Sequence, residues 1–215
     1  MSRWVLVTRG AGELGRLPVA LAGRGISVVP FPVLTENPVD DPEGWERARS
    51  AGRRLRWLAL TSPRAASAAF AASRRHGAWE LLTGLPVAAV GARTAEAARD
   101  LGLRVAIEGR GGGRELAAAL GAAAGPDDVV LHACGRDHRN ELADGLGASG
   151  IGLVAVIAYR MDAVPAEQLP TLPPGDPEAV LLTSPHATAA YLEVRGGAPF
   201  SCSHFAMGET TAAEA

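Results

Sequence analysis

Hydroxyl side chains occur at matching places in the two halves of the sequence. The run Thr61-Ser62-Pro63-Arg64-Ala65 returns as Thr183-Ser184-Pro185-His186-Ala187. Serine is a favoured N-cap residue and proline suits the first helical position, so each run predicts the start of a helix. A helix start presents free N–H groups and the positive end of the helix dipole beside the hydroxyls. Together these groups can form a binding site for a carboxylate. Capping without any function explains the two runs equally well.

An apolar strand and a Gly-x-x-Thr motif follow each of these runs. The first motif spans Gly91 to Thr94 and the second spans Gly208 to Thr211. Glycine lets the backbone approach a ligand, and each threonine is expected to open the next helix, with Glu214 at capping-box spacing from Thr211. Ligands of open parallel sheets bind beyond the carboxyl ends of strands, where all these motifs fall. The predicted substrate-binding residues are Thr61, Ser62, Gly91, Thr94, Ser184, Gly208, Thr210 and Thr211.

Three arginines lie in or just beyond the same predicted loops: Arg9, Arg64 and Arg136. A guanidinium group can pair with a carboxylate through two hydrogen bonds, so we add these three residues to the predicted binding set. Taken singly, each is more typical of a solvated surface arginine.

A glycine-rich run near the N-terminus, Gly10 to Gly15, has the G-x-G-x-x-G spacing of dinucleotide-binding folds. The strand after it runs into Pro30 rather than into an acid that could bind ribose. Pro18 would also break a helix that opened at Gly12, although it suits the first turn of a later helix. A nucleotide-binding protein is therefore the weaker alternative, and an ordinary strand-to-helix turn is expected.

His132, Cys134 and His138 are residue types that bind metals. Alternation along a strand places the first two on one face, whereas His138 is expected several residues away in a loop. No fourth ligand has a suitable spacing, so no metal site is predicted. The sequence also lacks the G-x-S-x-G motif, the P-loop lysine and paired catalytic carboxylates, and no cofactor is predicted.

The segments that must position these groups alternate between short apolar runs and alanine-rich stretches of helical period, which is typical of a parallel α/β fold. Predicted strands are Trp4 to Thr8, Ile26 to Val29, Trp57 to Thr61, Pro86 to Val90, Val129 to Ala133, Gly152 to Ile157, Ala179 to Thr183 and Phe205 to Met207. Predicted helices are Pro18 to Ala22, Ala65 to Arg75, Thr94 to Leu101, Arg114 to Ala123, Asn140 to Ala148 and His186 to Val194. The pair Asp40-Asp41 is interpreted as a solvated turn.

The repeat extends upstream of the hydroxyl motifs. Val5-Leu6-Val7 and Ile26-Ser27-Val28-Val29 have counterparts in Val129-Val130-Leu131 and Ile151-Gly152-Leu153-Val154. Two similar halves imply two similar domains. The second copy stops just after its Gly-x-x-Thr motif, whereas the first continues into a further strand, a glycine-rich turn and a helix. We therefore expect the last strand and helix of the second half to be missing, as in a truncated chain.

Composition excludes several classes of function. The chain has 215 residues, 47% of them hydrophobic, and a formal net charge of −2, so no overall positive field attracts nucleic acid or an acidic membrane. Its apolar runs fall short of the roughly 20 residues that cross a bilayer. With only two cysteines and no secretory signal, a cytoplasmic location is expected.

The motifs together resemble those of the uroporphyrinogen-III synthase family. They are Val-Leu-Val-Thr-Arg at the start, Leu-Thr-Ser-Pro-x-Ala twice, Ala-x-Gly-x-x-Thr twice, and Ile157-Ala158-Tyr159-Arg160 between the halves. The resemblance implies two similar parallel-sheet α/β domains of flavodoxin-like type, joined by a two-stranded linker, with the ligand cleft between them. Domain 1 would comprise residues 1–33 and 163–215, domain 2 residues 37–155, and the linker strands residues 31–35 and 156–160.

The same resemblance implies a lyase that closes the linear tetrapyrrole hydroxymethylbilane into uroporphyrinogen III. Water is lost to give an azafulvene, the substituted carbon of the terminal pyrrole is attacked, and a spiro intermediate recloses with that ring inverted. Such an enzyme needs no cofactor, acts mostly as a monomer, and holds the substrate carboxylates through hydroxyls and backbone N–H groups. Tyr159 matches the family's tyrosine and would assist departure of the hydroxyl, since phenols are protonated at neutral pH.

Two alternatives stay open at this stage. Tyr159 could be an aromatic residue that only packs on the linker. The whole chain could be a non-catalytic, synthase-like domain that binds tetrapyrroles or regulates a larger protein. The isomer formed from hydroxymethylbilane distinguishes an enzyme from such a domain.

Overall fold

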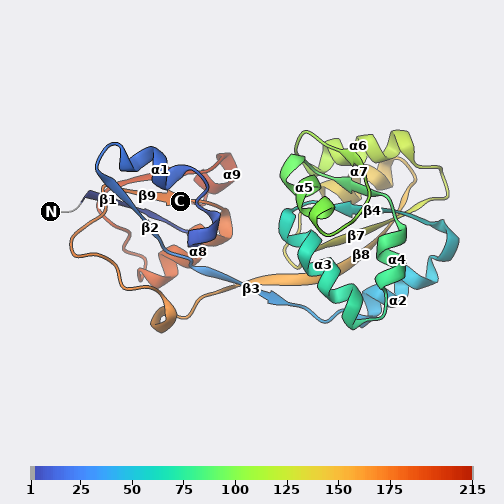
Figure 1. The fold of residues 1–215 in the computed structure, drawn as a ribbon, viewed down its shortest axis with the longest axis horizontal. Helices are drawn as coiled ribbons and strands as arrows, with labels where there is room; N and C mark the ends of the chain where they lie inside the picture. Colours follow the sequence, from blue (N-terminus) through green and yellow to red (C-terminus); the bar gives the residue numbers. More distant parts are fainter. Residues whose placement is uncertain (1–2, 215) are drawn as a thin grey trace. The chain divides into compact units, whose positions relative to one another are not determined.

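The computed structural model describes residues 3–214, which form two compact units. Unit 1 is built from the residues up to Glu36 together with those from Met161 onward, and unit 2 is the continuous segment Asn37–Arg160. Each unit holds a parallel sheet with helices against it, which confirms the predicted α/β class (Figure 1).

Unit 1 contains a four-stranded sheet in the order β10-β9-β1-β2. All neighbouring pairs are parallel. The strands are β1 (Arg3–Val7), β2 (Ile26–Pro30), β9 (Ala179–Leu182) and β10 (Ser203–Ala206). The helices are α1 (Leu17–Ala22), α8 (Pro185–Val194) and α9 (Glu209–Ala212), with short 3-10 turns at Ala11–Glu13 and Ala166–Gln168. Pro18 lies in the first turn of α1, as the sequence predicts.

The second sheet has the order β3-β8-β7-β4-β5-β6. Its strands are β3 (Leu34–Pro38), β4 (Leu55–Leu60), β5 (Val87–Ala89), β6 (Val105–Glu108), β7 (Val129–Gly135) and β8 (Gly152–Ala163). Its helices are α2 (Pro42–Ser50), α3 (Pro63–Arg75), α4 (Trp79–Gly84), α5 (Ala92–Asp100), α6 (Gly113–Ala123) and α7 (Glu141–Ala148), with a 3-10 turn at Gly52–Arg54.

The internal repeat is visible in the order of the strands. In unit 1 the sequence across the sheet is β2-β1-β9-β10, and in unit 2 it is β8-β7-β4-β5. Each strand of the first series corresponds to the strand at the same place in the second, as the repeated sequence motifs require. Unit 2 continues with β6 and α6, which have no counterpart among the described residues of unit 1.

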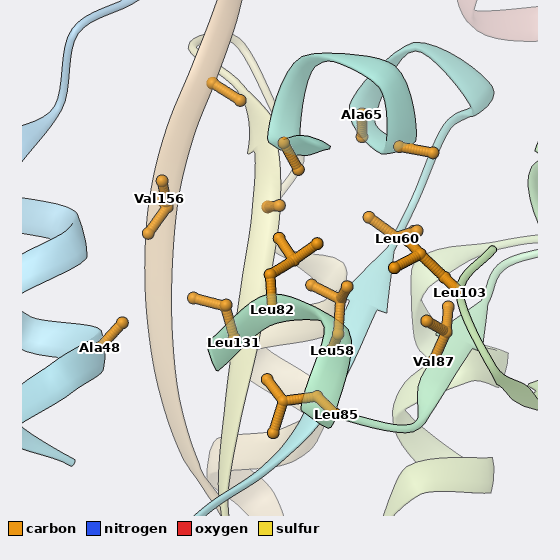
Figure 2. Close-up of a cluster of buried hydrophobic side chains, with 14 of the residues drawn as sticks. Ala48, Leu58, Leu60, Ala65, Leu82, Leu85, Val87, Leu103, Leu131 and Val156 are labelled. Carbon is orange, nitrogen blue, oxygen red and sulfur yellow. The ribbon is translucent and has the colours of Figure 1, made fainter. Parts of the chain in front are cut away.

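The core of unit 2 has two layers because successive side chains of a strand point to opposite faces. Leu58 and Leu60 of β4 belong to the cluster under α2, α3, α4 and α5, whereas Ala59 belongs to the cluster under α6 and α7. Figure 2 shows the first cluster, where Leu82 of α4 lies near Leu131 of β7. Burial on both faces explains why these strands are nearly continuous apolar runs.

One prediction about unit 2 is wrong, and two of its helices were missed. Asp41 is not in a solvated turn: its Oδ1 accepts a hydrogen bond from the Gly44 N–H at 2.9 Å and caps α2, while its Oδ2 accepts one from the Ile157 N–H at 2.9 Å. Helices α2 and α4 were not predicted, because α2 buries few apolar side chains and α4 has only six residues.

The strand expected at residues 31–35 begins later, at Leu34. Pro30 and Pro32 cannot donate ladder hydrogen bonds, and Phe31 and Val33 are instead buried in the core of unit 1. Beyond them, β3 pairs with β8, which is a single strand of 12 residues that includes the expected segment 156–160.

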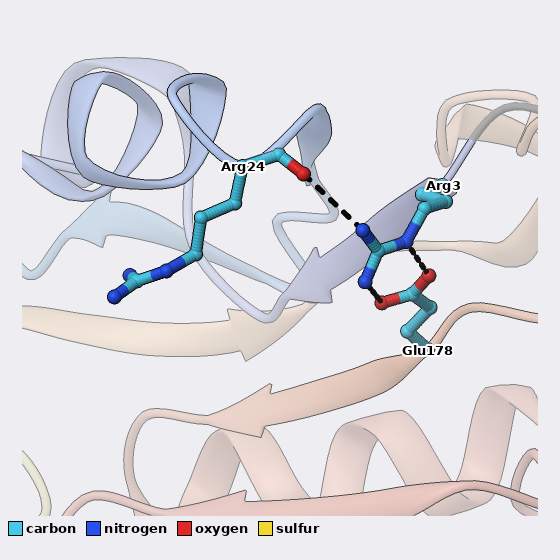
Figure 3. A network of polar contacts seen from close by, with 3 residues as sticks. All are labelled: Arg3, Arg24 and Glu178. Carbon is cyan, nitrogen blue, oxygen red and sulfur yellow. Dashed lines mark hydrogen bonds and ion pairs between the residues drawn. The ribbon is translucent and has the colours of Figure 1, made fainter.

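The amino end of β1 is hydrogen-bonded to two loops of unit 1. The Arg3 guanidinium donates to both carboxylate oxygens of Glu178, just before β9, and to the Arg24 carbonyl oxygen at 3.2 Å, just before β2 (Figure 3). The Glu178 carboxylate raises the pKa of Arg3, and Arg3 lowers the pKa of Glu178. Because these side chains are largely exposed, the pair sets the loop geometry more than it adds stability.

Candidate active site

The two Thr-Ser-Pro runs cap helices, as predicted. Ser62 follows β4, and its Oγ accepts a hydrogen bond from the Ala65 N–H at 3.0 Å at the start of α3. Ser184 follows β9, and its Oγ accepts one from the Ala187 N–H at 3.2 Å at the start of α8. Proline occupies the first turn of both helices. Each unit therefore places one capped helix start at the carboxyl edge of its sheet.

Tyr159 lies beside the first of these caps. Its hydroxyl oxygen is 3.1 Å from Ser62 Oγ, although the two residues are 97 positions apart in the sequence. The ring packs against the core of unit 2, so the packing role considered for this tyrosine is present as well. Both side chains are partly exposed. A phenol that is held by its ring and that ends beside a helix start can donate a proton to a group bound there.

Gly135 makes room for this tyrosine. A Cβ atom at Gly135 would lie 2.8 Å from Cζ and 3.1 Å from the hydroxyl oxygen of Tyr159. The next residue, Arg136, donates its N–H to the Tyr159 carbonyl oxygen at 2.9 Å. The end of β7 thus fixes the position of Tyr159 through close contact and through the backbone.

Thr61 is joined to a histidine that the sequence did not point to as a site residue. Its Oγ1 is 3.1 Å from His132 Nε2 on the neighbouring strand β7. Burial lowers the pKa of His132 to about 4, and the nearby His138 acts in the same direction. At neutral pH the imidazole is therefore uncharged, and Thr61 faces a neutral hydrogen-bonding partner.

The equivalent place in unit 1 holds two threonines. Thr8 and Thr183 have their hydroxyl oxygens 3.2 Å apart, and the Thr183 N–H donates to Thr8 Oγ1 at 3.1 Å. Thr183 corresponds to Thr61 in the repeat, and Thr8, which follows Val5-Leu6-Val7, corresponds to His132, which follows Val129-Val130-Leu131. Extending the repeat by one residue would have identified both pairs.

The threonines of the Gly-x-x-Thr motifs do not open their helices. Gly91 and Gly208 occupy the N-cap positions of α5 and α9, and Thr94 and Thr211 lie inside these helices, 3% and 2% exposed. Thr211 Oγ1 donates to the Met207 carbonyl oxygen at 3.3 Å, so the expected capping box is absent. Thr210 is exposed. The expectation is wrong because the glycine of each motif occupies the N-cap position. The last threonine of the motif then lies in the first turn, on the buried side of the helix.

The two glycines differ in what they require. Gly208 has φ = 100°, a conformation that favours glycine, whereas Gly91 has φ = −178°, which any residue adopts. A Cβ at Gly91 would meet only the Gly109 carbonyl oxygen, at 3.8 Å. Only Gly208 therefore needs to be glycine for its local backbone.

The predicted arginines are dispersed. Arg64 lies in the first turn of α3 and Arg136 just after β7, both exposed and both in unit 2, whereas Arg9 follows β1 in unit 1 and is partly exposed. Within unit 2 the structure gathers Thr61, Ser62 and Tyr159 through the contacts described above. Arg9, Ser184, Gly208, Thr210 and Thr211 belong to unit 1.

His138 does not lie away from its strand, contrary to the sequence-based expectation. A tight turn brings it back: the Gly135 carbonyl oxygen is 3.2 Å from the His138 backbone N and 3.0 Å from its Nδ1. The His132 and His138 rings are 5.3 Å apart in an edge-on arrangement. One ligand atom from each of His132, Cys134 and His138 lies within 4.8 Å of the others. Burial raises the pKa of the Cys134 thiol to about 12, and Asp41 adds to this increase.

A cavity of about 500 Å³ lies at the opposite end of the same strands. Its lining includes Arg53, Arg56, Trp57, Arg104 and Asp128, which sit at or near the amino ends of β4, β6 and β7. The sequence did not identify this cavity, because its arginines come from separate segments of the chain. Ligands of parallel sheets bind at the carboxyl ends of the strands, so Thr61, Ser62 and Tyr159 remain the candidate site.

Comparison with known proteins identifies a family. The family model described as uroporphyrinogen-III synthase HemD matches residues 16–215. No curated protein matches the chain by sequence. A crystal structure of a mutant uroporphyrinogen III synthase from Thermus thermophilus aligns with a TM-score of 0.64 at 18% identity, over 99% of this chain and 87% of that one. The synthetase from Helicobacter pylori aligns with a TM-score of 0.66 at 16% identity, over 98% and 86%. At such identities the structural matches establish the fold.

None of the described helices is both long enough and apolar enough to cross a bilayer.

Proposed function

The chain belongs to the uroporphyrinogen-III synthase HemD family, and we propose that it closes hydroxymethylbilane into uroporphyrinogen III with inversion of the terminal pyrrole ring. The reaction is that of a cyclising lyase, which loses the hydroxymethyl oxygen as water. The observation that carries the proposal within the structure is the pair Ser62 and Tyr159, whose hydroxyl oxygens lie 3.1 Å apart at the start of α3.

The proposed role of Tyr159 is to protonate the departing hydroxyl group. Water leaves far more readily than hydroxide, so a proton donor at this oxygen lowers the barrier. The ring of Tyr159 is held by the core of unit 2 and its backbone by Arg136, which keeps the phenol in one orientation. Ser62 Oγ is close enough to orient the phenolic hydrogen or to return a proton after the step.

The proposed role of the helix starts is to bind substrate carboxylates. Both α3 and α8 begin just after a strand, with a serine hydroxyl and free N–H groups near the surface. Thr61 adds a hydroxyl held by the neutral His132, and Arg64 adds a positive charge in the first turn of α3. Arg9, Arg136 and Thr210 are further proposed contacts, whereas the buried Thr94 and Thr211 are proposed to support the backbone that carries Gly91 and Gly208.

The remaining proposals concern the setting of the activity. The described cysteines, Cys134 and Cys202, are both free thiols, which fits a reducing, cytoplasmic location. We propose that the enzyme acts as a monomer, as the family resemblance implies. We also propose that it acts without a cofactor, because the chemistry requires only proton transfer and folding of a flexible substrate.

The decisive experiment supplies hydroxymethylbilane to the purified protein and separates the oxidised products. Formation of the type III isomer in excess of the spontaneous type I isomer supports the proposal. Binding of the substrate with only type I product would instead identify a tetrapyrrole-binding domain without turnover. A protein with Tyr159→Phe provides the matched control for catalysis by this site.

A further inference from the structure

A cluster of metal-binding side chains lies next to the candidate site, and only His132 of the three takes part in the proposed function, through its hydrogen bond to Thr61. His132 and Cys134 come from β7, two residues apart and therefore on the same face of the strand. His138 returns to them through the turn after β7. Among the described residues these three bring their ligand atoms within 4.8 Å of one another.

We propose that His132, Cys134 and His138 form a site for a divalent cation of the zinc class. Two imidazoles and one thiol are ligands that favour Zn²⁺ and similar ions over Mg²⁺ or Ca²⁺. Three protein ligands with an open fourth position are the usual arrangement of sites whose ion remains accessible.

The separations suit such an ion after a small adjustment. Metal–ligand distances of about 2.0–2.3 Å in a tetrahedron place neighbouring ligand atoms about 3.3–3.6 Å apart. From the present limit of 4.8 Å the ligand atoms therefore have to approach one another by roughly 1 Å. Rotation of the partly exposed His138 can supply part of this movement. An ion can enter the site past His138, since the other two ligands, His132 and Cys134, are buried.

The hydrogen bonds around the cluster already orient the imidazoles. His138 Nδ1 is 3.0 Å from the Gly135 carbonyl oxygen, which leaves Nε2 for the ion. A backbone carbonyl that accepts from the second ring nitrogen is a recurrent feature around bound metals. His132 Nε2 is linked to Thr61 Oγ1. An ion bound by the His132 ring is therefore separated from a hydroxyl of the proposed substrate site by that ring alone.

Binding has a defined proton balance. The Cys134 thiol is protonated in the free protein and donates toward the Val156 carbonyl oxygen at 3.8 Å. Cysteine coordinates as a thiolate, so the S–H bond breaks, a sulfur–metal bond forms, and one proton passes to the buffer for each ion bound. No oxidation or reduction accompanies this step.

The proposal is tested with Co²⁺ and Zn²⁺ on the full chain. Wild-type protein should develop the thiolate-to-cobalt charge-transfer absorption and tetrahedral cobalt bands, which Zn²⁺ then removes. Calorimetry with Zn²⁺ in two buffers of different ionisation enthalpy should report about one proton released per ion. Cys134→Ser should abolish the charge-transfer band, whereas Cys202→Ser, which alters the other thiol, should leave it unchanged.

Two outcomes overturn the proposal: the absence of the charge-transfer band in wild-type protein, or its loss in Cys202→Ser but not in Cys134→Ser. His138→Gln at the partly exposed position guards against a misfolded cysteine variant and should weaken Zn²⁺ binding by at least about tenfold. A consequence for turnover rests on the proposed function: Zn²⁺ should slow wild-type enzyme and affect His138→Gln much less. Protein that binds Co²⁺ yet never forms the type III isomer would refute the function and leave the metal site intact.

Discussion

The hydroxyl oxygen of Tyr159 lies 3.1 Å from the hydroxyl oxygen of Ser62, the residue that caps α3. This contact joins a residue inside β8 to the loop after β4 across the intervening strand β7. It places a phenolic proton donor beside free helix N–H groups, which are the two requirements for binding a carboxylate-bearing substrate and protonating its leaving group.

Removing the Tyr159 hydroxyl should slow chemistry more than binding. Tyr159→Phe keeps the ring that packs on the core of unit 2 and deletes only the proton donor. We expect kcat for type III formation to fall by about 10²-fold, in the range typical of a lost general acid, with KM changed only slightly. Initial rates with separated isomers measure this effect.

Tyr191→Phe is the matched control, because it alters the other tyrosine of the chain. Tyr191 is buried in unit 1, where its hydroxyl accepts from the Phe200 N–H at 3.2 Å and lies 3.3 Å from His204 Nε2. Its loss should lower stability by about 1 kcal/mol and leave kcat nearly unchanged. Equal losses of kcat in the two variants would contradict the assignment of Tyr159.

Substitutions at Ser62 should separate capping from function. Ser62→Ala removes the acceptor for the Ala65 N–H and should cost about 1 kcal/mol of stability, whereas Ser62→Gly should cost only a few tenths. Both variants remove the partner of Tyr159, so both should lower kcat by a similar factor. Chemical denaturation and initial rates, measured on the same preparations, provide the comparison.

Ser184→Ala supplies the control for the capping effect alone. Ser184 Oγ makes the same capping bond in α8, at 3.2 Å, and no tyrosine hydroxyl among the described residues partners it. We expect a similar loss of stability, a higher KM from weaker carboxylate binding, and little change in kcat. A fall in kcat that follows stability across all three serine variants would show that Ser62 acts only as a cap.

Adding a methyl group at Gly135 should displace Tyr159. The Cβ of Gly135→Ala would lie 2.8 Å from Tyr159 Cζ, closer than van der Waals contact allows. The ring must shift and so lose its present placement beside Ser62; kcat should therefore fall at least as far as in Tyr159→Phe, with a stability loss of about 1–3 kcal/mol.

Gly147→Ala is the companion variant. Gly147 lies near the end of α7, and a Cβ there would meet nothing within 4 Å. Alanine favours the helix, so this variant should be as stable as wild type or slightly more so, with full activity. Normal turnover by Gly135→Ala would refute the view that the position of Tyr159 matters.

Local motifs predicted the helix starts well because their chemistry is contained in a few adjacent residues. Ser62-Pro63 and Ser184-Pro185 cap α3 and α8 as expected. The threonines of Gly91 to Thr94 and Gly208 to Thr211 were misplaced because the glycine itself takes the N-cap position, and the threonine then falls on the buried side of the helix.

Contacts that depend on tertiary structure could not be predicted from spacing. Tyr159 reaches Ser62 only because β8 and β4 flank β7 in one sheet. His138 lies against His132 only because the Gly135 carbonyl closes a tight turn after β7. The repeat did contain one usable signal, since the alignment that pairs Thr183 with Thr61 also pairs Thr8 with His132.

The buried His132 should make stability depend on pH. Its folded-state pKa is about 4, below the 6.5 of the unfolded chain, because burial disfavours the imidazolium and His138 adds repulsion. Between these values the unfolded chain binds a proton that the folded chain does not, so stability falls as pH decreases from about 6.5 to 4. The loss should reach about 3 kcal/mol, since one pKa unit corresponds to about 1.4 kcal/mol.

Denaturation followed by tryptophan fluorescence, with a chelator present, measures this dependence mainly in unit 2, which contains Trp45, Trp57 and Trp79. The control is His132→Thr, which gives unit 2 the pair of threonines that unit 1 has at Thr8 and Thr183. Threonine does not titrate, so the variant should lose most of the pH dependence in this window while retaining a hydrogen bond to Thr61. An unchanged slope would show that other groups control the acid sensitivity and that His132 is protonated without cost in the folded protein.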